Sequence, residues 1–392
     1  MNLDLAKRAD RILGSLLGHT LAFGDRVASL VRPPAPVDRV EHILLIKFWG
    51  LGNWALLRPL VGDVRARWPQ ARLTIATLAG NAPLVEDLAD DVLLVRSDRL
   101  TRTLADLGRA VHALRRQPPD LAIDFEQFSR SGALLARLGR AAQRIGFASG
   151  HAGRDGLYTV TVPRRTDVHA ARSFRDLVEA AGVAPGEPAL GGLSVREAGV
   201  RERDALALTQ PYVVLHPGSG DNFPGRRWSE AGFAAVGRAA VDAGRIVCVT
   251  GGAQEAELTG RIAAAIGPGA RDLAGRCSLD GLVALLAEAD ALVANDTGPV
   301  HLASQLGVPV LALYGPNTPV LYGPRSEGSQ AFYRDLPCSP CIRASNYRSS
   351  RCRIFTCMET IPTGEVVTAL QHRLARADAE RSHAPHAGEP HA

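Results

Sequence analysis

The sequence is almost without lysine: of its 45 basic residues only Lys7 and Lys47 are lysines, and the others are arginines. It also lacks any block of consecutive basic residues long enough to form a nucleic-acid arm, so we expect no nucleic-acid partner. Aromatic residues make up only 5% of the chain. With a formal net charge of +5, the arginine-rich balance favours small anionic ligands, because the planar guanidinium fork suits phosphate groups.

Long apolar runs are missing as well, and no stretch predicts a membrane-spanning helix. The amino end comes nearest, but glycines and polar residues dilute it and no convincing cleavage site for a signal peptide follows. Apolar residues recur there at approximately helical spacing, so residues 1–37 are predicted to form an amphipathic helix and a stiff proline-rich linker. The helix either packs on the protein or lies on an anionic membrane face.

Six cysteines are present, and four of them are grouped near the carboxyl end. A four-thiolate structural zinc site is one interpretation of this group, and free cytosolic thiols or a redox pair are the others. The remaining two cysteines lie in apolar settings typical of core residues. The grouped cysteines are Cys338, Cys341, Cys352 and Cys357.

A chain of 392 residues is long for one core and natural for two domains. Short apolar strands alternate with helices in each half, which predicts two doubly wound α/β domains. We expect the first domain over residues 38–190, a linker rich in Gly, Pro and Glu over 191–209, and the second domain over 210–375. The tail, residues 376–392, is mostly Ala, Arg, Glu, Pro and His, and is predicted to be disordered.

The most informative stretch follows the apolar run Ala289 to Ala294, where the chain reads Asn-Asp-Thr-Gly-Pro. Proline is favoured at the first helical position, so a strand, a short turn and a helix are expected. Ligands collect beyond the carboxyl ends of parallel strands, and a helix N-terminus offers N–H groups to an anion. We therefore predict a phosphate site beside Asp296, Thr297 and Gly298. The alternative is that Asp296 and Thr297 only cap the helix.

Further motifs occur in order along the second half: Leu215 to Gly220, Arg227-Trp228, Val249 to Gly252, Leu273 to Gly275, and the Asp296 turn. Together they resemble the carboxyl half of glycosyltransferase family 9, the family of the ADP-heptose:lipopolysaccharide heptosyltransferases. The resemblance spans roughly residues 40–366. It implies the GT-B architecture, with two Rossmann-like domains facing across a cleft.

The resemblance also implies an activity, the inverting, metal-independent transfer of a sugar from a nucleotide-diphospho-sugar. ADP-heptose is one candidate donor. No cofactor is implied for catalysis. The acceptor would be a lipopolysaccharide core, another glycan or glycolipid, or a metabolite, bound by the first domain while the second binds the donor. We expect a cytoplasmic protein, and a membrane-bound acceptor would suit a helix resting on the inner membrane face.

Several side chains match the donor-binding positions of the family. Asp296, Thr297, Gly298 and His301 occupy the positions of the family's donor-binding turn. Arg227 stands where the family commonly has a lysine that reaches the donor diphosphate, and Gly218, Ser219 and Gly220 let backbone N–H groups approach a phosphate. Gly251-Gly252 and Glu255 resemble the segment beside the nucleoside, where a carboxylate can accept hydrogen bonds from ribose hydroxyls. Glu257 competes for that role, and either glutamate could instead be an exposed helical residue.

The first domain departs from the family pattern at the presumed base. Heptosyltransferases carry Gly-Asp in the loop after the first strand, whereas this chain has Gly52-Asn53. An amide can hydrogen-bond an acceptor hydroxyl but cannot take its proton. Glu126 is the first candidate to replace the base and Asp124 a weaker one. The protein could otherwise be slow, use an acidic acceptor that needs no base, or only bind nucleotide sugars. A GT-B epimerase is disfavoured because the Asp296 turn matches family 9 specifically.

Overall fold

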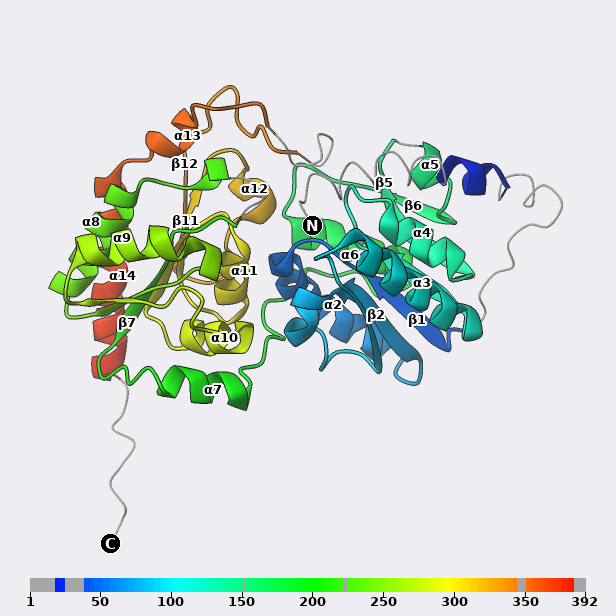
Figure 1. Cartoon of the computed structure of the whole chain (residues 1–392), viewed down its shortest axis with the longest axis horizontal. Helices are drawn as coiled ribbons and strands as arrows, with labels where there is room; N and C mark the ends of the chain where they lie inside the picture. Colours follow the sequence, from blue (N-terminus) through cyan, green and yellow to red (C-terminus); the bar gives the residue numbers. More distant parts are fainter. Residues whose placement is uncertain (1–17, 25–38, 151, 221–223, 344–349, 384–392) are drawn as a thin grey trace, which may run out of the picture. The chain divides into compact units, whose positions relative to one another are not determined.

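The computed structural model describes residues 18–24, 39–150, 152–220, 224–343 and 350–383 (Figure 1). The chain forms two compact units. The first contains Met1–Leu193, Val320–Tyr322 and Ile342–Ser350, and the second contains Ser194–Pro319, Gly323–Cys341 and Arg351–Ala392. We had placed all of residues 210–375 in the second domain. The two short segments that join the first unit carry no periodic pattern from which this could be predicted.

The first unit is built on a six-stranded parallel sheet with the order β3-β2-β1-β4-β5-β6. Its central strand β1 (His42–Ile46) is buried, and its last four residues are at most 1% exposed. The other strands are β2 (Arg72–Leu78), β3 (Asp91–Val95), β4 (Leu121–Asp124), β5 (Gln143–Ala148) and β6 (Val160–Pro163). The helices are α2 (Leu51–Arg67), η1 (Ala79–Leu84), α3 (Leu100–Arg116), α4 (Ser131–Leu138), α5 (Ala152–Asp155) and α6 (Ala170–Ala180).

The second unit repeats the design with a parallel sheet of order β12-β11-β10-β7-β8-β9. Its strands are β7 (Tyr212–His216), β8 (Ile246–Val249), β9 (Ala270–Asp272), β10 (Ala291–Asn295), β11 (Val310–Tyr314) and β12 (Gln330–Tyr333). Its helices are α7 (Glu197–Asp204), η2 (Pro224–Arg226), α8 (Glu230–Asp242), η3 (Ala253–Glu255), α9 (Ala256–Ile266), α10 (Leu279–Ala287), α11 (Gly298–Gln305), α13 (Thr356–Glu359) and α14 (Thr363–His383). Helix α12 (Pro319–Tyr322) begins in this unit, and its last three residues belong to the first unit. The predicted fold class, two doubly wound α/β domains, is confirmed.

The boundary between the units, at Leu193 and Ser194, falls within the predicted linker, but the linker contains a helix, and the prediction of a disordered tail was wrong through His383. The expected linker 191–209 contains helix α7, whose Gly199 lies so close to α10 that an added Cβ would be 2.2 Å from the Asp280 carbonyl oxygen. The tail is helical through His383, because α14 buries an apolar stripe and its Arg381 donates a 2.6 Å hydrogen bond to Asp290 Oδ1. Residues 384–392 of the predicted tail lie outside the described residues. The buried stripe consists of Val366, Leu370, Leu374 and Ala377.

Only residues 18–24 of the predicted amino-terminal helix are described, and they are helical. Ala22 packs in a small core cluster with Ala133, Leu157 and Tyr158 of the first unit, which agrees with the packed interpretation of this segment. Phe23 is 71% exposed. The proline-rich linker lies outside the described residues. Among the described helices, none has the length and apolarity needed to cross a bilayer.

Candidate functional site

The predicted donor-site residues of the second unit follow three neighbouring strands. Strands β10, β7 and β8 are adjacent in the sheet, and the Asp296 turn, the loop 216–220 and the segment 250–255 begin at their carboxyl ends. Parallel strands present these ends at one edge, where ligands of doubly wound sheets bind. The fold therefore brings these predicted residues to one edge of the second sheet.

The Asp296 side chain does not cap α11. Its Oδ2 accepts a 2.9 Å hydrogen bond from Asn317 Nδ2 and lies 3.6 Å from Arg226 Nη1. Thr297 is the N-cap residue, but it makes no side-chain capping bond, and its hydroxyl donates instead to the Asn295 carbonyl at 3.1 Å. The capping alternative is therefore wrong. His301 is buried within α11, at 6% exposure.

Glu255 clamps the loop that follows β7. Its Oε1 accepts the backbone N–H groups of Ser219 and Gly220, each at 3.0 Å, and its Oε2 accepts that of Gly252 at 3.1 Å. Arg227 Nη2 lies 3.5 Å from Oε1. An added Cβ on Gly218 would be 2.2 Å from the carboxylate, so only glycine fits there. The carboxylate predicted to meet ribose is thus turned inward to hold the glycine loop.

The competing glutamate behaves differently. The Glu257 side chain is 91% exposed and pairs with Arg261 at 2.7 Å. Its position on α9 matches the alternative of an exposed helical residue with an i,i+4 partner. Its contacts therefore tie it to its own helix rather than to the glycine loop.

Two residues that we did not select from the sequence join the Asp296 turn to the loop 216–220. Arg226 donates to the Asp296 carbonyl through Nη1 and to the Ser219 carbonyl through Nη2, both at 2.8 Å. Asn295 donates through Nδ2 to the Pro217 carbonyl at 2.7 Å and accepts the Trp228 N–H at 3.0 Å. The Arg-Arg-Trp motif was a signal for Arg226, but it did not tell which arginine bridges the loops.

A neutral histidine and a partly exposed arginine lie at this edge of the sheet. Burial lowers the pKa of His216 to about 4, so its imidazole is neutral at physiological pH. His216 Nδ1 lies 3.0 Å from the Thr250 hydroxyl oxygen, which fixes the ring. The Arg227 side chain is 33% exposed. A partly exposed guanidinium beside glycine backbone can bind phosphate oxygens.

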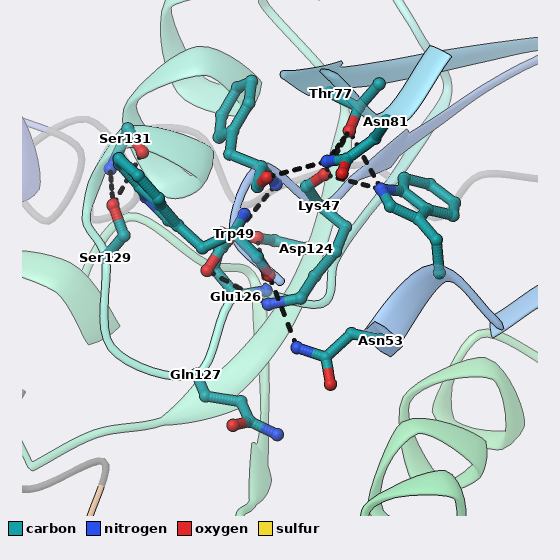
Figure 2. A network of polar contacts seen from close by, with 12 residues as sticks. Lys47, Trp49, Asn53, Thr77, Asn81, Asp124, Glu126, Gln127, Ser129 and Ser131 are labelled. Atoms are coloured by element: carbon teal, nitrogen blue, oxygen red, sulfur yellow. Dashed lines mark hydrogen bonds and ion pairs between the residues drawn. The ribbon is translucent and has the colours of Figure 1, made fainter. Parts of the chain in front are cut away.

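In the first unit, Asn53 lies in the first turn of α2 rather than in a loop. The chain turns at Gly50 with φ of 92°, and α2 begins directly after it, at Leu51. Asn53 Nδ2 donates a 3.3 Å hydrogen bond back to the Trp49 carbonyl (Figure 2). The turn needs glycine for its positive φ, and a Cβ added to Gly50 would lie 2.6 Å from Asn53 Nδ2, so the Asn53 amide would have to move.

Glu126 is not placed as a general base. It is fully buried, and its Oε1 accepts the N–H groups of Phe48 at 2.7 Å and Trp49 at 2.9 Å. Its Oε2 lies 3.2 Å from Lys47 Nζ, which is itself 1% exposed (Figure 2). The position of Glu126 after β4 could be predicted, but the inward direction of its side chain could not. The contacts of Glu126 in this structure favour a structural role, and its action as a replacement base stays a prediction.

Asp124, the weaker candidate, is also engaged. Its Oδ1 accepts the Glu126 N–H at 2.9 Å and its Oδ2 accepts the Tyr158 hydroxyl at 2.6 Å. Burial raises its pKa to about 6, although the charge of Arg154 opposes the shift. A buried carboxyl group with both oxygens bonded inside the fold cannot reach an acceptor.

The predicted metal site is not formed. Within the described residues, which include all four grouped cysteines, no set of three or more His, Cys, Asp or Glu side chains is arranged to hold a metal ion. Cys357 is buried against Gly315, whereas Cys338 and Cys352 are exposed, so the thiols face different surroundings. All six cysteines are free thiols. The choice between free thiols, a redox pair and a zinc site stays a prediction.

Comparison with known proteins gives consistent matches. Residues 107–350 match the model of the family described as glycosyltransferase family 9 (heptosyltransferase). Lipopolysaccharide heptosyltransferase 1 of Pseudomonas aeruginosa is 30% identical over 316 residues, 77% of this chain and 86% of that protein. Lipopolysaccharide heptosyltransferase 2 of Escherichia coli K12 is 34% identical over 127 residues, and the match spans only 36% of its length.

A solved structure agrees at the level of the fold. The E. coli ADP-heptose lps heptosyltransferase II superposes with a TM-score of 0.70 and covers 86% of this chain and 99% of its own, at 23% identity. The predicted GT-B architecture is therefore confirmed: each unit has the expected fold, and the two units follow one another in the expected order along the chain.

Proposed function

The chain belongs to glycosyltransferase family 9, and we propose that it is an inverting, metal-independent glycosyltransferase that moves a sugar from a nucleotide-diphospho-sugar to an acceptor hydroxyl. The observation that carries this proposal is the assembly around Arg226, which joins the Asp296 turn to the glycine loop at the edge where donors bind in such sheets. ADP-heptose is the donor we favour, because the heptosyltransferase that shares the fold is named for it.

In this proposal the second unit compensates the charge of the departing diphosphate. The Arg227 guanidinium and the first turn of α11 supply positive charge where the leaving group develops its negative charge, while Glu255 holds the N–H groups of Ser219 and Gly220 and so fixes the loop beside them. Thr297, Gly298 and His301 lie on that turn beside Asp296. The backbone of Gly252 borders the nucleoside, and Glu255 acts by holding the loop rather than by binding ribose.

The first unit would bind the acceptor, which we take to be a glycan, a glycolipid such as a lipopolysaccharide core, or a metabolite. Asn53 would accept a hydrogen bond from the attacking hydroxyl, since an amide cannot remove its proton. We place the protein in the cytoplasm. We also propose that it contacts the inner membrane face peripherally, although residues 18–24 of its amino-terminal helix are packed on the first unit.

The experiment is transfer and hydrolysis by the purified full chain against a panel of nucleotide sugars, with and without acceptors and with EDTA. We expect release of nucleoside diphosphate with a glycosylated product, an inverted anomeric centre by NMR, and no loss of rate in EDTA. Failure of every donor to be consumed, or retention at the anomeric carbon, would contradict the proposal. Consumption of donor without acceptor to give an isomeric nucleotide sugar would instead identify an epimerase.

A second candidate is a nucleotide-sugar-binding protein of the same family with impaired catalysis. Asn53 favours it, because the position of the family's presumed base carries an amide. Donor binding by the wild type without turnover, together with turnover gained in Asn53→Asp, would establish this candidate. Faster transfer by Asn53→Asp over an active wild type would instead support the first.

A further inference from the structure

Lys47 and Glu126 form a buried ion pair beneath the loop that follows β1. Lys47 is one of two lysines in the chain, and its side chain and that of Glu126 are 1% and 0% exposed. Two ions are costly to bury, and such a pair persists where hydrogen bonds satisfy the groups that remain. Here the other oxygen of Glu126 accepts two backbone N–H groups, those of Phe48 and Trp49. The pair therefore fixes the backbone of this loop.

The same loop is held on its carbonyl side. The Lys47 carbonyl accepts hydrogen bonds from Trp54 Nε1 at 3.0 Å and from the Thr77 hydroxyl at 2.7 Å. The Phe48 carbonyl accepts one from Asn81 Nδ2 at 3.0 Å (Figure 2). A loop bonded through both its N–H and its carbonyl groups is preorganised, as a positioned reactive group requires.

A continuous path leads from Glu126 to Asn53. Glu126 accepts the Trp49 N–H, and the Trp49 carbonyl accepts a hydrogen bond from Asn53 Nδ2. A carbonyl only accepts, so the group that faces it must be the amide nitrogen, and the amide oxygen points the other way. Figure 2 shows this oxygen turned away from the network.

We propose that Glu126 is a positioning residue of the transfer reaction, which orients Asn53 through the Trp49 backbone so that the amide oxygen accepts a hydrogen bond from the acceptor hydroxyl. This role rests on the proposed glycosyltransferase function. It gives Glu126 a task different from that of a base, because the carboxylate acts through the Trp49 backbone and touches no substrate.

The test is a double-mutant cycle between Glu126→Gln and Asn53→Ala in the full chain. A glutamine cannot serve Lys47 and both N–H groups as a carboxylate does, because its second terminal atom is a donor. We expect each single variant to lower kcat by about tenfold or more while donor KM changes by less than about twofold. The double variant should be little worse than either single one, because both act through one amide.

Asp120→Asn is the matched control. Asp120 Oδ2 accepts the N–H groups of Glu41 at 2.8 Å and His42 at 2.9 Å, so it also clamps two backbone groups, but at the amino end of β1. It should lose thermal stability while kcat stays within about twofold of the wild type. If Asp120→Asn and Glu126→Gln lower kcat equally at equal loss of stability, Glu126 is merely structural.

Two further measurements distinguish a positioning role of Glu126 from a role as a base or a merely structural role. The acidic limb of the pH–rate profile should keep its position in Glu126→Gln. If Glu126 were the general base, its replacement would remove that limb. Hydrogen exchange should accelerate at residues 48–53 in Glu126→Gln and not in Asp120→Asn. Additive kinetic effects, a lost acidic limb or unchanged exchange would each overturn the role of Glu126. A wild type without any transfer would overturn the proposed function itself, and this role with it.

Discussion

The backbone N–H of Ser219 and the carboxylate of Glu255 lie 3.0 Å apart, although 36 positions separate them in the chain. A carboxylate from the segment that follows β8 thereby sets the shape of the loop after β7 through the N–H groups of Ser219 and Gly220, and it also accepts the N–H of Gly252. Hydrogen bonds to a charged acceptor are worth about 1.5–3 kcal/mol each, so this clamp is strong enough to decide the conformation of the loop.

Replacing Glu255 by alanine should therefore weaken nucleotide binding and stability together. One buried and two partly buried N–H groups lose their acceptor, and we expect the free energy of unfolding to fall by about 2–4 kcal/mol and the Kd for ADP to rise by about tenfold. Urea unfolding and calorimetric titration measure the two effects. Glu257→Ala, at an exposed position on the neighbouring helix, should change stability by less than about 0.5 kcal/mol. Unchanged ADP affinity in Glu255→Ala would contradict the clamp.

Arg226→Lys tests the bridge between the glycine loop and the Asp296 turn. Lysine keeps the charge, but it lacks the planar fork that reaches the Ser219 and Asp296 carbonyls together. We expect ADP affinity to fall by about tenfold, as for one lost hydrogen bond from a charged donor. The same change at Arg261, which pairs with Glu230 and Glu257 on the surface, is the control. Equal ADP affinities for the two variants would rule out a bridging role.

Asp124 makes stability depend on pH in a predictable direction. Its pKa is raised from 3.8 to about 6 in the folded protein, so the native state binds this proton more tightly than the unfolded chain does. The contribution is fully present below pH 4 and is lost as the pH rises through 6, with a size of about 3 kcal/mol.

Asp124→Asn should remove that slope. An asparagine can accept the Glu126 N–H through Oδ1 and donate to the Tyr158 oxygen through Nδ2, so it mimics the protonated acid. Urea unfolding between pH 4 and pH 8 should show wild type and variant converging at low pH and the variant more stable at pH 7. Parallel curves for the two proteins would refute the assignment.

Gly50→Ala should lower kcat by more than its effect on stability explains. The new Cβ meets Asn53 Nδ2 at 2.6 Å, and φ of 92° is strained for any residue other than glycine. Gly244→Ala is the matched control, because Gly244 has φ of 76° and no atom within 4 Å of the added Cβ. Both variants should lose about 1–2 kcal/mol, whereas only Gly50→Ala should lower kcat. Equal rates in the two variants would argue against a role for the Asn53 geometry.

Much of the architecture was predictable because it rests on local patterns. The apolar run of β1, the alternation of strands and helices and the Pro299 signal after the Asp296 turn are all read within a few residues. The order of the motifs likewise led to the family. Strands β6 and β12 and helix α7 were not predicted, because they are short and have no strong periodicity of their own.

The orientation of the Glu126 and Glu255 carboxylates was decided only by the tertiary structure. The sequence by itself determined two doubly wound units, their family and the turns at which polar residues gather. It could not tell that Glu126 and Glu255 turn inward, because the N–H groups that they accept come from loops 78 and 36 positions away. A buried carboxylate must be hydrogen-bonded, so its orientation depends on where the donors lie. These donors come close to the carboxylate only when the parallel sheet brings the carboxyl ends of neighbouring strands together.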